Sequence, residues 1–439
     1  MIKTVKFGGS SLADASQFVK VKNIILSDPS RRYVVVSAPG KRYKGDDKIT
    51  DLLYECQSLA QSGASFANVF GRIERRYIQI RDRLGLATDI ESRLSDIYHV
   101  IENGTSPDYA ASRGEYLNAL LMADYLGFQF VDAAELICFH EDGSYDDEKT
   151  LVRTRALKRL KCAVIPGFYG KRSDGSIRTF SRGGSDITGS IVARATESNL
   201  YENWTDVSGF LMADPRIVPE ARVIDSVTYA ELRELSYMGA TVLHEDSIFP
   251  VRKARIPINV RNTNHPEDSG TMIVPDVMSV PDRTFPLTGI AGRRGFTVIT
   301  LQKDNMNSER GYAWRVCGIF ARYDVSIECM PCGIDTMSVV ASDAQLKGKM
   351  DAIYHDIMTE CVPDTVEIAS CIALIATVGV GMVRSRGVAA TLFSALADAD
   401  INIRIIDQGS SEMNIIIGVE QRDFENAVRA IYHKFEESI

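Results

Sequence analysis

Two glycine pairs follow strand-like segments, and each pair has one charged residue beside it. Gly8–Gly9 comes just after Lys6, and Gly183–Gly184 comes just before Asp186. Consecutive glycines let backbone N–H groups converge on an anion, and a helix that begins there adds the positive end of its dipole. A lysine neutralises a transferring phosphoryl group, while an aspartate orients that lysine or helps to bind Mg²⁺. Either turn alone is typical of an ordinary tight turn, but together they predict phosphoryl transfer by Lys6 and Asp186.

The elements that must position these turns alternate between β-branched runs and amphipathic stretches. We expect strands at 33–37 and 163–166, and helices at 115–126, ended by Gly127, and at 187–195. This alternation predicts an α/β fold with a mainly parallel sheet between helices. Ligands bind such sheets at the carboxyl ends of strands, where both glycine pairs, Ser37 and Gly167 are expected.

The composition is that of an ordinary globular protein with two or three domains. The 439 residues are 45% hydrophobic and 25% charged, and the formal net charge of −8 argues against a nucleic-acid partner. No apolar run reaches the ~18 residues of a membrane span, so we expect no membrane partner and a cytoplasmic location. The eight cysteines are too sparse for a disulfide framework. Cys329 and Cys332 have metal-ligand spacing but lack a second pair, so we expect no protein-held metal site.

The last third of the chain contains an internal repeat. Prolines and glycines interrupt the pattern near residues 264–290, and beyond them the segment from Gly311 matches the segment from Gly387 at an offset of 76 residues. Each copy predicts a helix after its glycine and then two short strands that form a hairpin. Two small α+β modules are therefore expected in this region.

Several motifs along the whole chain resemble the monofunctional aspartokinases of the amino-acid kinase superfamily. They are Lys6-Phe7-Gly8-Gly9-Ser10, Ser112-Arg113-Gly114-Glu115, Pro166-Gly167-Phe168, Ser181-Arg182-Gly183-Gly184-Ser185-Asp186, Trp204-Thr205-Asp206-Val207-Ser208-Gly209 and Ala213-Asp214-Pro215-Arg216. The repeat resembles the tandem ACT modules, which are ferredoxin-like, of that family. The resemblance implies a catalytic domain at 1–285 and a regulatory region at 286–439. In that region the first module covers about 304–375, and the second combines about 292–303, with its strand at Phe296–Leu301, and 376–439.

The resemblance implies that the β-carboxylate of L-aspartate attacks the γ-phosphoryl group of ATP, with Mg²⁺, as the first step of lysine, threonine and methionine biosynthesis. A carboxylate nucleophile needs no base, so the site must mainly supply positive charge and positioning. Lys6 and the backbone of Gly8, Gly9 and Ser10 would hold the phosphoryl oxygens, and Asp186 would direct the lysine. Arg182 would clamp a substrate carboxylate, and Glu115 would take the substrate ammonium group. Ser37, Thr50, Phe168 and Ser185 would line the aspartate pocket, with an insertion, Gly40–Lys48, before Thr50.

On the nucleotide side, the family pattern places Thr205, Asp206 and Leu211 near the adenosine and Arg216 near the phosphates. Thr241 stands where many relatives carry a lysine. Lys253 or Arg252 would then compensate, or Arg216 and magnesium would carry more of the phosphate charge. The competing interpretations are an acid at the start of its helix for Glu115 and a solvated turn residue for Arg216.

For regulation, the resemblance implies an amino-acid effector at an interface between first modules of two subunits. The positions implied are Met306, Glu309, Tyr312, Ala313, Ser326 and Glu328. Lysine is the expected inhibitor, and threonine, alone or with lysine, is the alternative. A homodimer through the ACT modules is expected, with pairing into tetramers left open, and the modules are alternatively only a dimerisation device.

Two other functions compete with a regulated aspartokinase. A kinase of glutamate or N-acetylglutamate would share the glycine turns but should lack Thr205-Asp206 with Asp214-Pro215-Arg216 and the repeat. A non-catalytic amino-acid sensor would keep the modules, but Lys6, Arg182 and Asp186 argue against it. Since the chain ends at Ile439, just after the second module, we expect a kinase alone and not a fused kinase-dehydrogenase.

Overall fold

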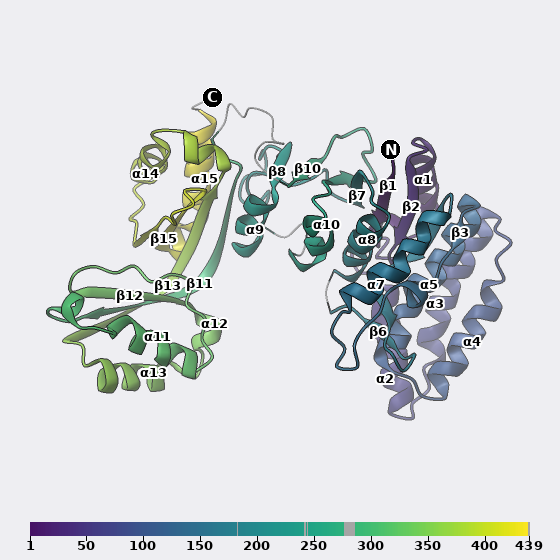
Figure 1. Ribbon diagram of the computed structural model, residues 1–439, viewed down its shortest axis with the longest axis horizontal. Coiled ribbons are helices and arrows are strands. Elements are labelled where there is room, and N and C mark those ends of the chain that lie inside the picture. Colours follow the sequence, from purple (N-terminus) through teal and green to yellow (C-terminus); the bar gives the residue numbers. More distant parts are fainter. Residues whose placement is uncertain (182, 241–242, 244, 276–285, 438–439) are drawn as a thin grey trace. The chain divides into compact units, whose positions relative to one another are not determined.

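The computed structural model describes residues 1–181, 183–240, 243, 245–275 and 286–437. Within this part the chain forms two compact units, shown in Figure 1. The first contains residues 1–210, 223–229 and 241–280, and the second contains residues 211–222, 230–240 and 281–439. The chain therefore passes between the units more than once.

The first unit is built on an eight-stranded sheet with the order β3-β4-β2-β1-β7-β9-β10-β8. Neighbouring strands are parallel, except that β9 and β10 are antiparallel. The strands are β1 Lys3–Phe7, β2 Arg31–Val36, β3 Gln129–Phe130, β4 Ala163–Pro166, β7 Leu200–Thr205, β8 Ser226–Thr228, β9 Ile258–Asn262 and β10 Thr271–Val274, with a separate hairpin of β5 Tyr169–Lys171 and β6 Ile177–Thr179. The predicted mainly parallel sheet is confirmed.

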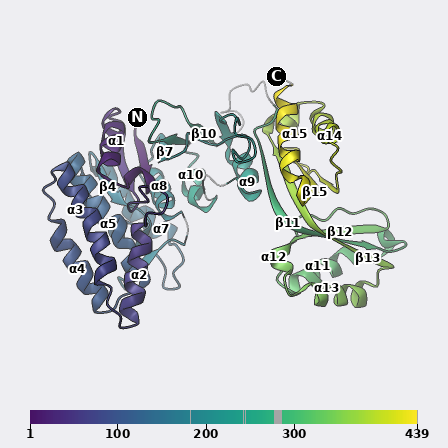
Figure 2. The same cartoon turned by 180° about the vertical axis from the view of Figure 1, so that it is seen from behind.

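Helices cover both faces of this sheet. They are α1 Ala15–Leu26, α2 Ile49–Gln61, α3 Ala67–Leu84, α4 Ile90–Glu102, α5 Pro107–Leu126, α6 Ala133–Leu136, α7 Asp147–Thr154, α8 Gly184–Ala195 and α10 Phe249–Lys253. Alternate residues of β2 face opposite cores: Val34 and Val36 pack in the core with α1 to α5, whereas Tyr33 and Val35 pack in the core with α6 and α8. Both faces are buried, as expected for a parallel sheet. Figures 1 and 2 both show α2, α3, α4 and α5 as neighbouring helices.

The predicted elements are present, with differences at their ends. The strand at Ala163–Pro166 is confirmed, the strand expected at 33–37 covers Arg31–Val36, and the helix expected at 187–195 begins at Gly184. The helix expected at 115–126 does end at Gly127, but it begins two turns earlier, at Pro107. Ser106 caps that end by accepting a hydrogen bond from the Tyr109 N–H, and proline suits the first helical position.

The second unit is built on a five-stranded antiparallel sheet with the order β12-β11-β13-β15-β14. Its strands are β11 Gly289–Gln302, β12 Thr336–Ser342, β13 Thr365–Val378, β14 Ile405–Asp407 and β15 Asn414–Glu420. Its helices are α9 Tyr229–Tyr237, α11 Tyr312–Arg322, α12 Asp343–Leu346, α13 Met350–Asp356, α14 Val388–Asp398 and α15 Phe424–Glu436. The first residue of α9, Tyr229, belongs to the first unit. The repeat is visible in the helices, since α11 and α14 both follow a glycine with positive φ, Gly311 at 80° and Gly387 at 86°. The predicted hairpin is formed by β14 and β15 in the second copy, while two isolated bridges to β12 replace it in the first.

Two long strands run through both modules of this unit. Residues 296–302 of β11 pair with β12, and residues 289–294 pair with the half of β13 that also pairs with β15. The strand at Phe296–Leu301, which the family pattern places in the second module, is thus the part of β11 that lies beside β12. A single continuous strand serves both copies (Figure 1).

Candidate active site

Lys6 lies at the centre of the candidate site and forms an ion pair with Asp186. Its Nζ is 2.6 Å from Asp186 Oδ1, and the lysine is only 7% exposed. Asn203 joins the pair: its Nδ2 donates to Asp186 Oδ1 at 2.8 Å, and its Oδ1 accepts from Lys6 Nζ at 3.4 Å. The parallel register of β1 and β7 places Lys6 directly opposite Asn203. The aspartate therefore holds the lysine in one direction, as predicted for a group that meets a phosphoryl oxygen.

The first glycine turn offers two backbone N–H groups beside this lysine. The N–H of Gly8 donates to the Trp204 carbonyl oxygen at 2.9 Å, whereas those of Gly9 and Ser10 have no acceptor among the described residues. A Cβ on Gly8 would lie 3.6 Å from Lys6 Nζ, so this glycine keeps the space beside the ammonium open. A Cβ on Gly9 would lie 2.9 Å from the Ala38 carbonyl oxygen. The N–H groups of Gly9 and Ser10 are thus free to donate, and Gly8 leaves room beside the lysine.

The second glycine turn packs against the segment that follows β4. Gly183 has a left-handed φ of 56° and directly precedes α8, while Arg182 before it lies outside the described residues. Phe168 also has a positive φ, 80°, which is rare for an aromatic residue and costs ~1–3 kcal/mol. The Phe168 N–H donates to Thr188 Oγ1 on α8 at 3.1 Å. Backbone strain held in this way is typical of a functional site.

The packing of Gly184 against Phe168 makes a testable prediction. A Cβ on Gly184 would lie 2.5 Å from Phe168 Cδ2 and 2.9 Å from its Cα, so the aromatic ring must move in a Gly184→Ala variant. We expect about 1–3 kcal/mol lower stability, as for other overpacked sites, and about a tenfold higher KM for the acceptor substrate. Urea unfolding and steady-state kinetics measure the two effects. The control is Gly71→Ala on α3, where a Cβ has nothing within 4 Å; a Gly184→Ala KM equal to that of the control contradicts a role for Phe168.

Glu115 is a buried carboxylate in the middle of α5. It is 5% exposed, and its Oε2 has no hydrogen-bond partner among the described residues. Burial raises its pKa to about 8, against the opposing effect of a hydrogen bond from the Ala38 backbone. The helix begins eight residues earlier, so the alternative interpretation of Glu115 as a helix-start acid is wrong. An unpaired buried carboxylate is costly, and a cationic ligand group removes that cost.

The remaining predicted substrate residues lie around the ends of β2 and β4. Ser37 follows β2, where its N–H donates to the Phe7 carbonyl and its own carbonyl accepts from Asn118 Nδ2 at 2.7 Å. Thr50 is the second residue of α2 and is half-buried. Ser185, in the first turn of α8, is buried, and a Cβ on Gly167 would meet its Oγ at 2.6 Å. Ser37 and Gly167 thus follow the neighbouring strands β2 and β4, whereas Thr50 and Ser185 lie in the first turns of α2 and α8.

The predicted nucleotide residues fall in both units. Thr205 ends β7 and donates to the exposed Asp206 at 3.2 Å in the first unit. Leu211 and Arg216 belong to the second unit. Arg216 is exposed and ion-paired with Asp214 at 2.6 Å in a turn, which is also what the alternative of a solvated turn residue requires. Thr241 lies outside the described residues.

The predicted effector residues surround the start of α11. Met306 and Tyr312 are buried in the core of the first module, with Ala313 packed against it, and Ser326 is exposed. Glu309 already has two cationic partners, Lys303 at 2.5 Å and Arg315.

Glu328, the second predicted effector carboxylate, instead accepts a 2.5 Å hydrogen bond from the Tyr237 hydroxyl. Burial, with this carboxylate beside it, raises the pKa of Tyr237 to about 12, so the phenol is neutral. Glu328 is thus the predicted effector carboxylate whose observed partner carries no charge.

Sequence reasoning missed Asn203 and Asn118. Both are amides in otherwise buried elements, and an isolated amide in a strand such as Leu200–Thr205 was the available signal. In the described part of the chain, no group of three or more His, Cys, Asp and Glu side chains is arranged to hold a metal ion. In the same part, no helix is both long and apolar enough to cross a membrane.

Comparison with known proteins identifies the class of protein that this fold and site define. The model of the amino acid kinase family matches residues 1–262, and an ACT domain model matches residues 375–435. Aspartokinase 3 of Bacillus subtilis is 37% identical over 99% of this chain and 98% of its own length. The crystal structure of Clostridium acetobutylicum aspartate kinase is 51% identical, covers 99% of this chain and 100% of that one, and has a TM-score of 0.93. The chain belongs to the aspartokinases.

A more distant structure is informative for its ligands. Escherichia coli aspartokinase III is 28% identical with a TM-score of 0.72, and the match covers 99% of both chains. It has been solved with aspartate and ADP, and also with lysine and aspartate.

Proposed function

We propose that this aspartokinase transfers the γ-phosphoryl group of MgATP to the β-carboxylate of L-aspartate, which yields 4-phospho-L-aspartate and ADP. This reaction is the first step of lysine, threonine and methionine biosynthesis. The observation that carries the proposal is the unpartnered, buried Oε2 of Glu115, in a helix that packs against the end of β2. Ala38 connects this carboxylate to the phosphate-binding turn, because its backbone lies against both Glu115 and Gly9.

In this reaction the substrate supplies the nucleophile, and the protein supplies charge and alignment. The Lys6 ammonium group, held by Asp186 and Asn203, is placed to offset negative charge on the transferring group. The N–H groups of Gly9 and Ser10 add neutral donors that need no reorganisation. Arg182 is proposed as the clamp for a substrate carboxylate. Magnesium enters with ATP and screens the nucleotide phosphates.

Glu115 also supports a choice between acceptor substrates. An α-ammonium group pairs with its free oxygen, whereas N-acetylglutamate carries an uncharged amide at that position. With that amide the buried carboxyl of Glu115 stays protonated and gains no ion pair, because burial raises its pKa to about 8. We therefore propose a free α-amino acid as the acceptor, with Ser37, Thr50, Phe168 and Ser185 around its side chain.

The effector is proposed to be lysine, bound around the start of α11. Glu328 is the carboxylate best placed for a lysine amine, because its observed partner Tyr237 is a neutral phenol while Glu309 is already paired with two cations. The N-terminal end of α11 suits the effector carboxylate. Dimerisation through the ACT modules remains a proposal, as does a cytoplasmic location.

A hydroxamate assay tests the reaction and its regulation together. Purified protein with MgATP and hydroxylamine is expected to form aspartyl hydroxamate from aspartate, and none from N-acetylglutamate or in the presence of excess EDTA. Lysine is expected to reduce the rate at saturating substrates more than threonine does. Turnover of N-acetylglutamate instead would refute the assignment of Glu115, and lysine binding by calorimetry without any turnover would favour a non-catalytic sensor.

A further inference from the structure

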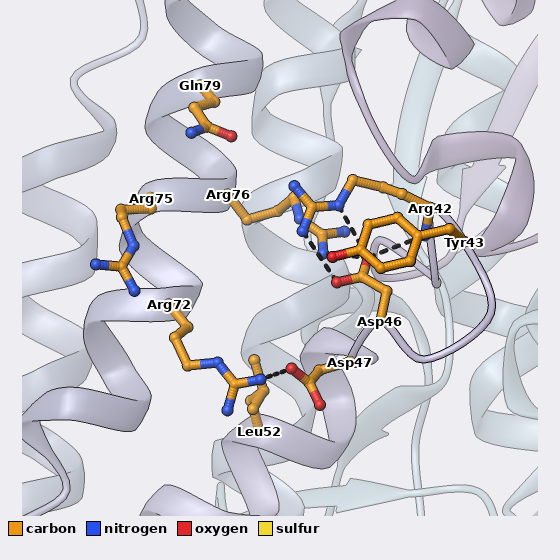
Figure 3. A pocket seen from close by; sticks show the side chains of 9 residues that line it. All are labelled: Arg42, Tyr43, Asp46, Asp47, Leu52, Arg72, Arg75, Arg76 and Gln79. Carbon is orange, nitrogen blue, oxygen red and sulfur yellow. Dashed lines mark hydrogen bonds and ion pairs between the residues drawn. The ribbon is translucent and has the colours of Figure 1, made fainter.

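A basic pocket of about 300 Å³ lies beside α3, and none of the residues that line it is assigned to catalysis. Figure 3 shows its lining, which consists of Arg42, Tyr43, Asp46, Asp47, Leu52, Arg72, Arg75, Arg76 and Gln79. One wall is a face of α3, and the other is the segment 42–47 within the insertion that the family pattern lacks. The volume is at the lower end of the range for small-molecule sites, about 300–1,000 Å³.

The charges in the basic pocket do not balance. Four guanidinium groups face two carboxylates, which leaves a net charge of +2 in a chain whose net charge is −8. Asp46 is fully engaged: Arg42 binds it with two hydrogen bonds of 2.9 Å, and Arg76 adds a third of 2.7 Å. Asp47 pairs with Arg72. Both available carboxylates are therefore already used.

Arg75 and Gln79 lie in the basic pocket without such partners. Neither side chain has a hydrogen bond or ion pair with the described residues, and both are drawn in Figure 3 without a dashed line. Residues 72, 75, 76 and 79 are three and four positions apart, so they share one face of the helix. Like charges at this spacing destabilise a helix. An anion between Arg72 and Arg75 would relieve that repulsion.

The basic pocket is also connected to the phosphate-binding turn. Arg76 Nη1 donates to the carbonyl oxygens of Gly40 at 3.0 Å and Ala13 at 3.1 Å. Gly40 in turn donates its N–H to the Gly9 carbonyl at 2.8 Å, and a Cβ on Gly40 would lie 2.6 Å from the Gly9 carbonyl carbon. A ligand that moves Arg76 or Asp46 therefore acts on the backbone that presents Gly9.

We propose that the basic pocket binds a small oxyanion with at least two negative charges, and that this binding changes the affinity of the phosphate turn for nucleotide. Guanidinium groups match phosphate and carboxylate oxygens with two parallel hydrogen bonds, and Arg72 and Arg75 are the groups that a ligand meets first. Both side chains are exposed on α3. Phosphate esters and small polycarboxylates share the required chemistry.

The test compares two variants on the same helix by calorimetry with the full chain. Inorganic pyrophosphate and citrate are titrated into the wild type, the double variant Arg72→Gln/Arg75→Gln and the control Arg83→Gln, which changes an arginine of α3 outside the pocket. We expect the double variant to bind the preferred anion at least about tenfold more weakly, and the control to match the wild type. Tighter binding of pyrophosphate indicates a site for phosphate groups, and tighter binding of citrate indicates a site for carboxylate groups. Thermal unfolding checks that all three proteins are folded.

A kinetic comparison separates this site from the catalytic one, and this second readout alone rests on the proposed function. If pyrophosphate competes only at Lys6, it raises the KM for ATP equally in all three proteins. If it also binds in the basic pocket, the KM for ATP changes further in the wild type and the control, and the double variant lacks this further change. Equal anion affinity in the double variant and the control overturns the proposal, as does the absence of binding to the wild type. The pocket would then only hold the segment 42–47 against α3.

Discussion

A Lys6→Met variant is expected to lose about 10²- to 10³-fold in kcat, which is the usual effect of removing one preorganised donor to a transition state. Lys6 is buried, is held by Asp186 at 2.6 Å and has open space beside Gly8 on its free side. In the proposed role, it contributes most when negative charge moves onto the transferring phosphoryl oxygens. We expect a much smaller change in the KM for aspartate. Steady-state hydroxamate kinetics with both substrates varied measure the two parameters.

Lys3 on the same strand provides the matched control. It pairs with Asp28 at 2.8 Å and with the buried Glu202 at 3.0 Å, so its role is structural. A Lys3→Met variant should be less stable to urea while it retains kcat within about threefold, since Arg31 still neutralises Glu202. Equal losses of kcat in the two variants would show that β1 is merely sensitive to charge removal, and Lys6 would lose its assigned role.

A Glu115→Gln variant is expected to be more stable than the wild type and yet to bind aspartate about 10²-fold more weakly. The gain in stability follows from burial, because glutamine fills the same space without a charge that the site disfavours. The loss of affinity follows from the removal of the partner for the substrate ammonium group, since charged hydrogen bonds contribute ~1.5–3 kcal/mol. Chemical denaturation and the KM for aspartate, with kcat as a check, give both quantities.

The pH dependence of the wild type has a definite sign. The pKa of Glu115 is about 8 in the folded chain against a reference value of 4.5, so between these values the folded state binds more protons than the unfolded state. Its contribution to stability is therefore greatest below pH 4.5 and is lost as the pH rises toward 8. Aspartate binding is expected to reverse the shift, because an ammonium group favours the ionised carboxylate. Binding near pH 7 should release a proton, which calorimetry in buffers of different ionisation enthalpy detects.

Glu202 provides the control for Glu115, because its pKa shifts in the opposite direction. It is equally buried, but Arg31 and Lys3 lower its pKa despite the burial that opposes them. A Glu202→Gln variant should lose stability near neutral pH, and the KM for aspartate should be unchanged. If Glu115→Gln also lost stability, or if aspartate bound without proton release in every buffer, the assignment of Glu115 as the ammonium partner would be wrong.

The sequence predicted those parts of the fold and site that depend on local pattern. The glycine pairs, the strand at Ala163–Pro166 and the two repeat helices are all encoded in short runs, and all are present. The Lys6–Asp186 pair was also predicted, since orienting the lysine was one of the two uses expected of an acid beside such a turn. The family resemblance extended these predictions to substrate and nucleotide residues, and the Glu115 variant tests the substrate side.

Features that arise from tertiary packing could not be predicted from the sequence. The start of α5 was missed because residues 110–115 are buried on every side and show no amphipathic period. Asn203 acquires its role only through the register of β7 beside β1, and the positive φ of Phe168 depends on its contact with α8. The charge of the basic pocket, likewise, comes from two segments that only the fold brings together.

The strands β11 and β13, each 14 residues long, also limit how this protein can be altered. The two strands pair with each other along their length, and β11 also pairs with β12 of the first copy while β13 also pairs with β15 of the second, so one continuous sheet contains both copies. A chimera that exchanged one copy for that of a relative would need at least two crossover points inside a ladder of hydrogen bonds. Recombination is therefore expected to transfer both copies as one block.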